Sequence, residues 1–105
     1  MTETDRLGKL KSLLEKNPAN SFALYGIAME YRSRGDLERA TTCFEELLSR
    51  FPGYCAAFLQ HGLTLAALGE LEGARRVYEQ GIRVCEEAGD DHAASELREA
   101  LQQLG

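Results

Sequence analysis

The chain has 105 residues, of which 44% are hydrophobic and 28% are charged, so it suits one compact domain with its own core and is too short for two. Its formal net charge is −5 and its arginines are scattered among glutamates, so we expect no nucleic-acid binding and no basic membrane-binding surface. The acidic, polar N-terminus is unlike a secretory signal, and the three cysteines are widely spaced, so we expect a cytoplasmic protein with reduced thiols.

The first predicted helix covers residues 5–17. Its leucines recur at the spacing of one helix face, which predicts an amphipathic helix. We expect this helix to flank the repeated part of the chain that follows it. The leucines are Leu7, Leu10, Leu13 and Leu14.

Residues 21–54 predict a pair of helices. Gly35 can adopt the left-handed conformation that ends a helix, and Asp36 can then cap the start of the next one. Pro52 marks the end of the second helix. Apolar residues at helical spacing form the packing stripes of the pair, with Leu24, Ile27, Ala28 and Tyr31 on the first helix and Ala40, Phe44, Leu47 and Leu48 on the second.

Residues 55–88 repeat this pattern. Pro18 and Pro52 stand 34 positions apart, and a shift of the same length places apolar residues on apolar ones and small residues on small ones. We therefore predict a second helix pair of the same kind, in which small residues let the two helices cross closely. The aligned positions include Gly35 with Gly69, Ala40 with Ala74, Phe44 with Tyr78, and Ala28 with Gly62.

The last predicted helix covers residues 91–104. Its apolar stripe consists of an alanine and three leucines, and its other faces are polar, as the end of a helical array requires. The whole chain is thus predicted to be all-α, with about six antiparallel helices in one domain, residues 1–105. The stripe is formed by Ala94, Leu97, Leu101 and Leu104.

The helix pair of residues 21–54 resembles the repeat of the tetratricopeptide repeat family, a helix-turn-helix unit of the same length. The matching residues are Tyr31, Ala40, Phe44 and Pro52. The resemblance, which extends to small bacterial-type members, implies a right-handed array of two full repeats with one helix at each end. It also implies a non-catalytic protein-interaction adaptor.

The second repeat, residues 55–88, matches the family at Gly62 and Ala74 and departs from it at two positions. His61 stands where leucine is usual, and Glu86 stands where proline is usual. We interpret His61 as a hydrogen-bonded, partly buried imidazole.

A second apolar stripe runs beside the packing stripe on the first helix of each repeat. A helix that is apolar on two sides is either buried on both or open to a partner. The resemblance implies that these positions line the groove that binds peptides, with His92, Ser95 and Glu99 as further polar neighbours. The alternative is that the helices curl tightly enough to bury the stripe themselves. The candidate groove residues are Phe22, Tyr25, Met29, Arg32, Leu59, Gln60 and Leu63.

The composition of this stripe indicates the kind of partner. One subclass of the family holds a C-terminal carboxylate with lysine and asparagine at these positions, which here are occupied by Tyr25, Met29, Leu59 and Leu63. We therefore expect an apolar or amphipathic peptide segment rather than a chaperone tail. The alternative function is a structural homo-oligomer, possible as a homodimer, that self-associates through the same groove or through an exchanged terminal helix.

The sequence offers no constellation for catalysis, a cofactor or a metal. His61, His92 and Cys55 lack the spacing of metal ligands, and no nucleophile triad or phosphate-binding glycine loop is present. Cys43 and Cys85 are interpreted as small packing residues. Residues 51–69 carry no formal charge, but their proline, glycines and polar side chains argue against membrane insertion.

Overall fold

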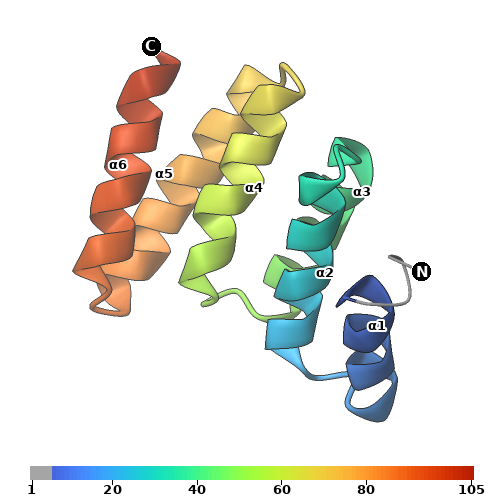
Figure 1. The fold of residues 1–105 in the computed structure, drawn as a ribbon. Coiled ribbons are helices and arrows are strands. Elements are labelled where there is room, and N and C mark those ends of the chain that lie inside the picture. The colour runs from blue at the N-terminus through green and yellow to red at the C-terminus, as the bar shows by residue number, and fades with distance from the viewer. Residues whose placement is uncertain (1–5) are drawn as a thin grey trace.

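The structure is a computed structural model that describes residues 6–105, so residue 5 of the first predicted helix lies outside the described part (Figure 1). Residues 6–105 contain helices and no strand, which confirms the all-helical prediction. The helices are α1 (Arg6–Lys16), α2 (Ser21–Ser33), α3 (Leu37–Arg50), α4 (Cys55–Ala67), α5 (Leu71–Glu87) and α6 (Asp91–Leu104).

Each helix packs against the next one in the chain, and the array is built from two layers (Figure 1). Helices α2, α4 and α6 are also in contact with one another in sequence order, α2 with α4 and α4 with α6. They form the layer that we call the inner face, and α3 and α5 form the other layer. The candidate groove residues all lie on α2 and α4, two helices of this layer.

The turns within the two repeats have the same geometry. Gly35 and Gly69 have φ angles of 82° and 83°, which only glycine adopts readily. After each glycine, a backbone N–H donates back to the last turn of the helix, from Asp36 to Tyr31 and from Glu70 to Leu65, at 2.9 Å in both. Because these bonds satisfy carbonyl groups at the helix end, both turns stop their helix at the equivalent position.

The core is a seam of aromatic and aliphatic side chains between the layers, made of three buried clusters that share partly buried neighbours such as Leu14 and Leu48. The fully buried side chains include Phe44 and Leu47 from α3, Phe58 from α4 and Tyr78 from α5. Leu97 of α6 is equally buried against the α4–α5 part of the seam. Helix α6 thus covers that end of the core and exposes polar residues on its other side.

Two glycines bring α4 and α5 very close together. A Cβ atom built on Gly62 would lie 2.2 Å from the Tyr78 ring, and one built on Gly81 would lie 2.6 Å from Cβ of Phe58. Both distances are too short for real carbon contacts. The predicted role of small residues at the crossing therefore holds at Gly62, and Gly81 provides a second close approach.

Candidate functional site

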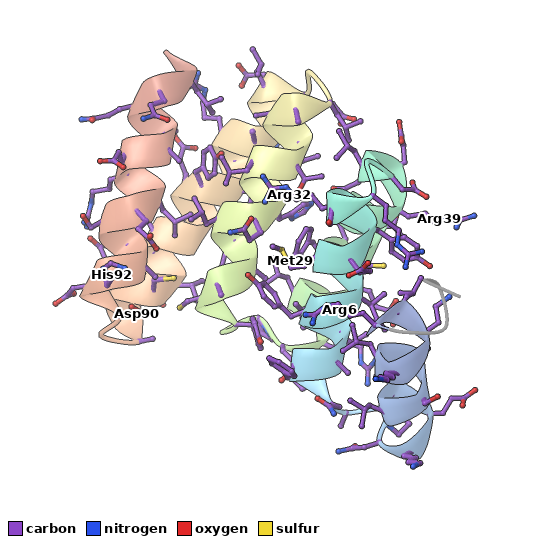
Figure 2. The ribbon with its side chains drawn as sticks, in the orientation of Figure 1. Arg6, Met29, Arg32, Arg39, Asp90 and His92 are labelled. Atoms are coloured by element: carbon purple, nitrogen blue, oxygen red, sulfur yellow. The ribbon has the colours of Figure 1, made fainter. Side chains whose placement is uncertain are left out.

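The candidate groove residues occupy one side of α2 and α4 but differ in exposure. Phe22, in the first turn of α2, is 64% exposed. The others are half-buried. Figure 2 shows Met29 and Arg32 pointing from α2 towards α4. The structure thus places the candidate residues on two neighbouring helices of the inner face, where Arg32 of α2 reaches Gln60 of α4.

Part of the second stripe also belongs to the core. The Tyr25 ring lies edge-on to Phe44, with centroids 6.2 Å apart, and 5.4 Å from the Tyr54 ring. Met29 packs against the same buried cluster, and Leu59 packs against the cluster of the second repeat. Burial raises the pKa of the Tyr25 phenol, and the neighbouring Tyr54 raises it further. Both phenols therefore stay neutral hydrogen-bonding groups at the edge of an apolar surface.

A polar bridge joins the two repeats on this face. The Arg32 guanidinium donates through Nη1 to the Gln60 side-chain carbonyl, linking α2 to α4. Burial raises the pKa values of the Tyr25 and Tyr78 phenols, and the positive charge of Arg32 partly offsets this rise. The apolar stripe therefore ends at a fixed positive charge that lies close to aromatic rings.

The predicted polar neighbours on α6 are all exposed. His92 lies at the start of α6, near Asp90 in the turn before it (Figure 2). Its Nε2 is 3.7 Å from a carboxylate oxygen of Glu96 in the next turn. Ser95 and Glu99 follow on the same helix. These side chains add hydrogen-bonding groups to the α6 part of the array and no apolar area.

His61 is buried between α3 and α4. It is 5% exposed, its Nε2 lies 2.9 Å from the Thr41 hydroxyl, and its ring stacks on Phe44 at a centroid distance of 5.9 Å. Burial lowers the pKa of this imidazole from 6.5 to about 4, and its Nδ1 has no hydrogen-bond partner in the described residues. The interpretation as a hydrogen-bonded imidazole is confirmed, and its burial is deeper than the sequence suggests.

The sequence did not predict the cavities on the other side of the array, away from the inner face. Two cavities of about 280 and 370 Å³ adjoin between α3, α4 and α5. Another, of about 610 Å³, lies along the outside of α1 beside Leu13. No sequence signal marks the first two, because their walls combine side chains from three different helices whose packing the sequence does not specify. The residues shared by these two cavities are Glu45, His61, Val77 and Gln80.

Two further features bear on the possible chemistry. Among residues 6–105, no three histidine, cysteine or carboxylate side chains are grouped closely enough to hold a metal ion. The helices in this part of the chain are all too short or too polar to cross a membrane.

Comparisons with known proteins agree with the geometry of the helix pairs. Residues 22–54 match the family model described as tetratricopeptide repeat (TPR). A TPR repeat-containing protein of Pseudomonas aeruginosa is 32% identical over 95 residues, which cover 90% of each chain. The solution structure of a tetratricopeptide repeat domain protein from Salinibacter ruber is 31% identical, with a TM-score of 0.79 over 84% of this chain and 89% of that one. A Bordetella parapertussis protein, 24% identical, shares the fold with a TM-score of 0.82 over 93% and 85% of the two chains.

Proposed function

Because the chain belongs to the tetratricopeptide repeat family, whose fold fits a protein–protein interaction module, we propose that it is a non-catalytic adaptor that binds a partner segment on its inner face. The bound segment is apolar or amphipathic and lies along the side of α2 and α4 that carries Phe22, Tyr25, Met29, Leu59 and Leu63. Arg32 and Gln60 form the polar end of this site.

The observation that carries the proposal is the exposure of Phe22. An aromatic side chain that is 64% exposed gains little from folding, whereas covering it with a partner stabilises a complex by about 1.5–3 kcal/mol. Tyr25 and Met29 follow it at the spacing of one helix face, and both are half-buried, so the apolar surface continues along α2. Aromatic and methionine side chains are typical anchors of protein interfaces.

The polar end of the site supports an oriented partner. Arg32 is held by Gln60, so its position is partly fixed before binding. A guanidinium group has several donors, and those not used on Gln60 can be offered to carbonyl or carboxylate oxygens of the bound segment. An amphipathic segment would place its apolar side chains on the α2 stripe and its acidic or carbonyl oxygens near Arg32.

The alternative occupant of the inner face is a second copy of the chain. The same exposed Phe22 would be covered in a homo-oligomer, directly or through an exchanged terminal helix. Sedimentation at low and high protein concentration separates the two functions. A chain that is monomeric at both concentrations supports a heterologous partner. A dimer that forms at high concentration and that Phe22→Ser dissociates supports self-association.

Replacing the exposed aromatic should weaken peptide binding without weakening the fold. Linear peptides selected from a random phage library on the wild-type chain are the probe, with Kd measured by fluorescence anisotropy. We expect Phe22→Ser to cost about 2 kcal/mol or more of binding free energy, a factor of about 30 in Kd, because interface anchors carry that much. The melting temperature should hardly change, since the side chain is exposed.

Leu71→Ser is the matched control. Leu71 is 49% exposed and lies at the start of α5, in the other layer. This variant loses a comparable exposed apolar side chain, so its Kd should equal that of the wild type. Selected peptides that bind Phe22→Ser as tightly as the wild type, or that lose affinity for Leu71→Ser instead, would contradict the proposal.

A further inference from the structure

The antiparallel packing of α4 and α5 sets two cysteines opposite each other. Gly81 of α5 lies so close to Phe58 of α4 that an added Cβ would come within 2.6 Å of the Phe58 Cβ. Moving three residues back from Phe58 and four residues on from Gly81 stays on the same two helix faces. These steps reach Cys55, the first residue of α4, and Cys85, near the end of α5. The close crossing therefore extends to this cysteine pair.

The contacts of both side chains agree with this register. Cys85 is 0% exposed and belongs to the buried cluster of the second repeat, and the half-buried Cys55 packs against the same cluster. Burial raises the pKa of Cys85 to about 12, and the neighbouring Cys55 side chain and the charge of Asp90 act in the same direction. The two cysteines thus share one cluster, with Cys85 inside it and Cys55 at its surface.

We propose that Cys55 and Cys85 are a reversible redox site, which a small-molecule disulfide such as glutathione disulfide converts into an intramolecular disulfide between the start of α4 and the end of α5. Such a bond needs two Cβ atoms about 3.5–4.5 Å apart, so it suits two cysteines on facing sides of a close helix crossing. This proposal does not depend on the inner face binding a partner.

The oxidation proceeds in two exchange steps. The Cys55 thiol, which is the accessible one, gives up its proton, and its sulfur attacks one sulfur of glutathione disulfide. The bond between the two glutathione sulfurs breaks, and the departing glutathione thiolate takes up a proton. Cys85 then loses its proton and attacks the Cys55 sulfur of the mixed disulfide, which releases the second glutathione. Two protein thiols lose two electrons in total, and glutathione disulfide is reduced to two glutathione molecules.

Cys43 provides an internal reference. It lies on α3 and packs against the clusters of the first repeat, away from the cluster that contains Cys85. Cys43 is half-buried, as Cys55 is. The labelling of Cys43 therefore shows how accessible a half-buried thiol is when no second cysteine lies in its cluster. A reaction that is specific to the pair removes the free thiols of Cys55 and Cys85 together and leaves the Cys43 thiol free.

The test equilibrates the folded full chain in buffers of increasing glutathione disulfide, quenches in acid and labels free thiols with a maleimide in denaturant. Intact mass and peptide mapping should show loss of two of the three labels, at Cys55 and Cys85, with no glutathione attached and Cys43 still labelled. The oxidised protein should also melt at a higher temperature, because the cross-link restricts the unfolded chain. Dithiothreitol should restore all three labels.

Two variants keep the test decisive. Cys43→Ser should oxidise as the wild type does. In Cys55→Ser, the Cys85 thiol should stay free at every concentration of glutathione disulfide. Full labelling of Cys55 and Cys85 in the most oxidising buffer would overturn the proposal. So would a glutathione adduct on Cys55 that never closes, or a disulfide that contains Cys43.

Discussion

Lowering the pH from 6.5 towards 4 should destabilise the protein through His61 by up to about 3 kcal/mol, because each unit of pKa difference corresponds to about 1.4 kcal/mol. Burial holds the pKa of His61 at about 4 in the folded state, whereas the unfolded chain has the ordinary value of 6.5. Between these values the unfolded state binds a proton that the folded state does not. The free energy of unfolding therefore falls as the pH falls through this window, and the loss is complete below pH 4.

The measurement is urea unfolding at pH 7 and at pH 4, compared between the wild type and His61→Leu. Carboxylates titrate in the same range, so the informative quantity is the difference between the two proteins. Leucine is the usual residue of the family at this position, and it also removes the unpartnered Nδ1. His61→Leu should therefore lose much less stability at pH 4.

His92→Leu is the control for this comparison, because its side chain is 86% exposed. It should follow the wild type at both pH values. Equal acid sensitivity in the wild type and His61→Leu would show that His61 is not held neutral by burial.

Adding a single methyl group at Gly81 should lower the free energy of unfolding by about 1–3 kcal/mol, which is the usual effect of overpacking a core. The new Cβ in Gly81→Ala would meet Cβ of Phe58 at 2.6 Å and a methyl group of Leu97 at 3.0 Å. Because a Cβ is attached directly to the backbone, Phe58 cannot turn out of the way. The helices must move apart, although alanine favours a helix over glycine by about 1 kcal/mol.

Gly73→Ala on the same helix separates packing from helix propensity. Its nearest contact would be Leu65 at 3.7 Å, an ordinary distance. This variant should be as stable as the wild type or up to about 1 kcal/mol more stable. Thermal unfolding of both variants checks the pair, and a Gly81→Ala protein that melts at or above the wild-type temperature would contradict the close α4–α5 crossing.

The fold was predictable because its signals are local. The spacing of Leu24, Ala28 and Tyr31 predicts one helix face, and Gly35 followed by Asp36 predicts the turn that the structure shows, with the Asp36 carboxylate accepting from the Arg39 N–H. The shift that aligns the two repeats predicts the same turn geometry at Gly69. Each of these signals depends on neighbours within a few positions in the sequence.

The details of the site depend on how helices meet, which the sequence does not specify. The stripe on α2 identifies Tyr25 as a candidate groove residue, but its ring contacts with Phe44 and Tyr54 depend on how α2 sits against α3 and α4. Cys55 and Cys85 are far apart in the sequence, and they meet only through the antiparallel register of α4 and α5. The degree of burial of the second stripe follows from the same packing, so the pattern alone leaves both alternatives open.

A nuclear magnetic resonance footprint tests most directly whether the inner face holds the partner segment. Titrating a phage-selected peptide into the isotope-labelled chain should shift backbone amides of α2 and α4 most, around Phe22, Arg32 and Leu63. Amides beside Glu45 and Gln80, which line the cavities between α3 and α5, should stay in place. Shifts centred on those cavities, with α2 unaffected, would contradict the proposal and place the binding surface on the opposite layer.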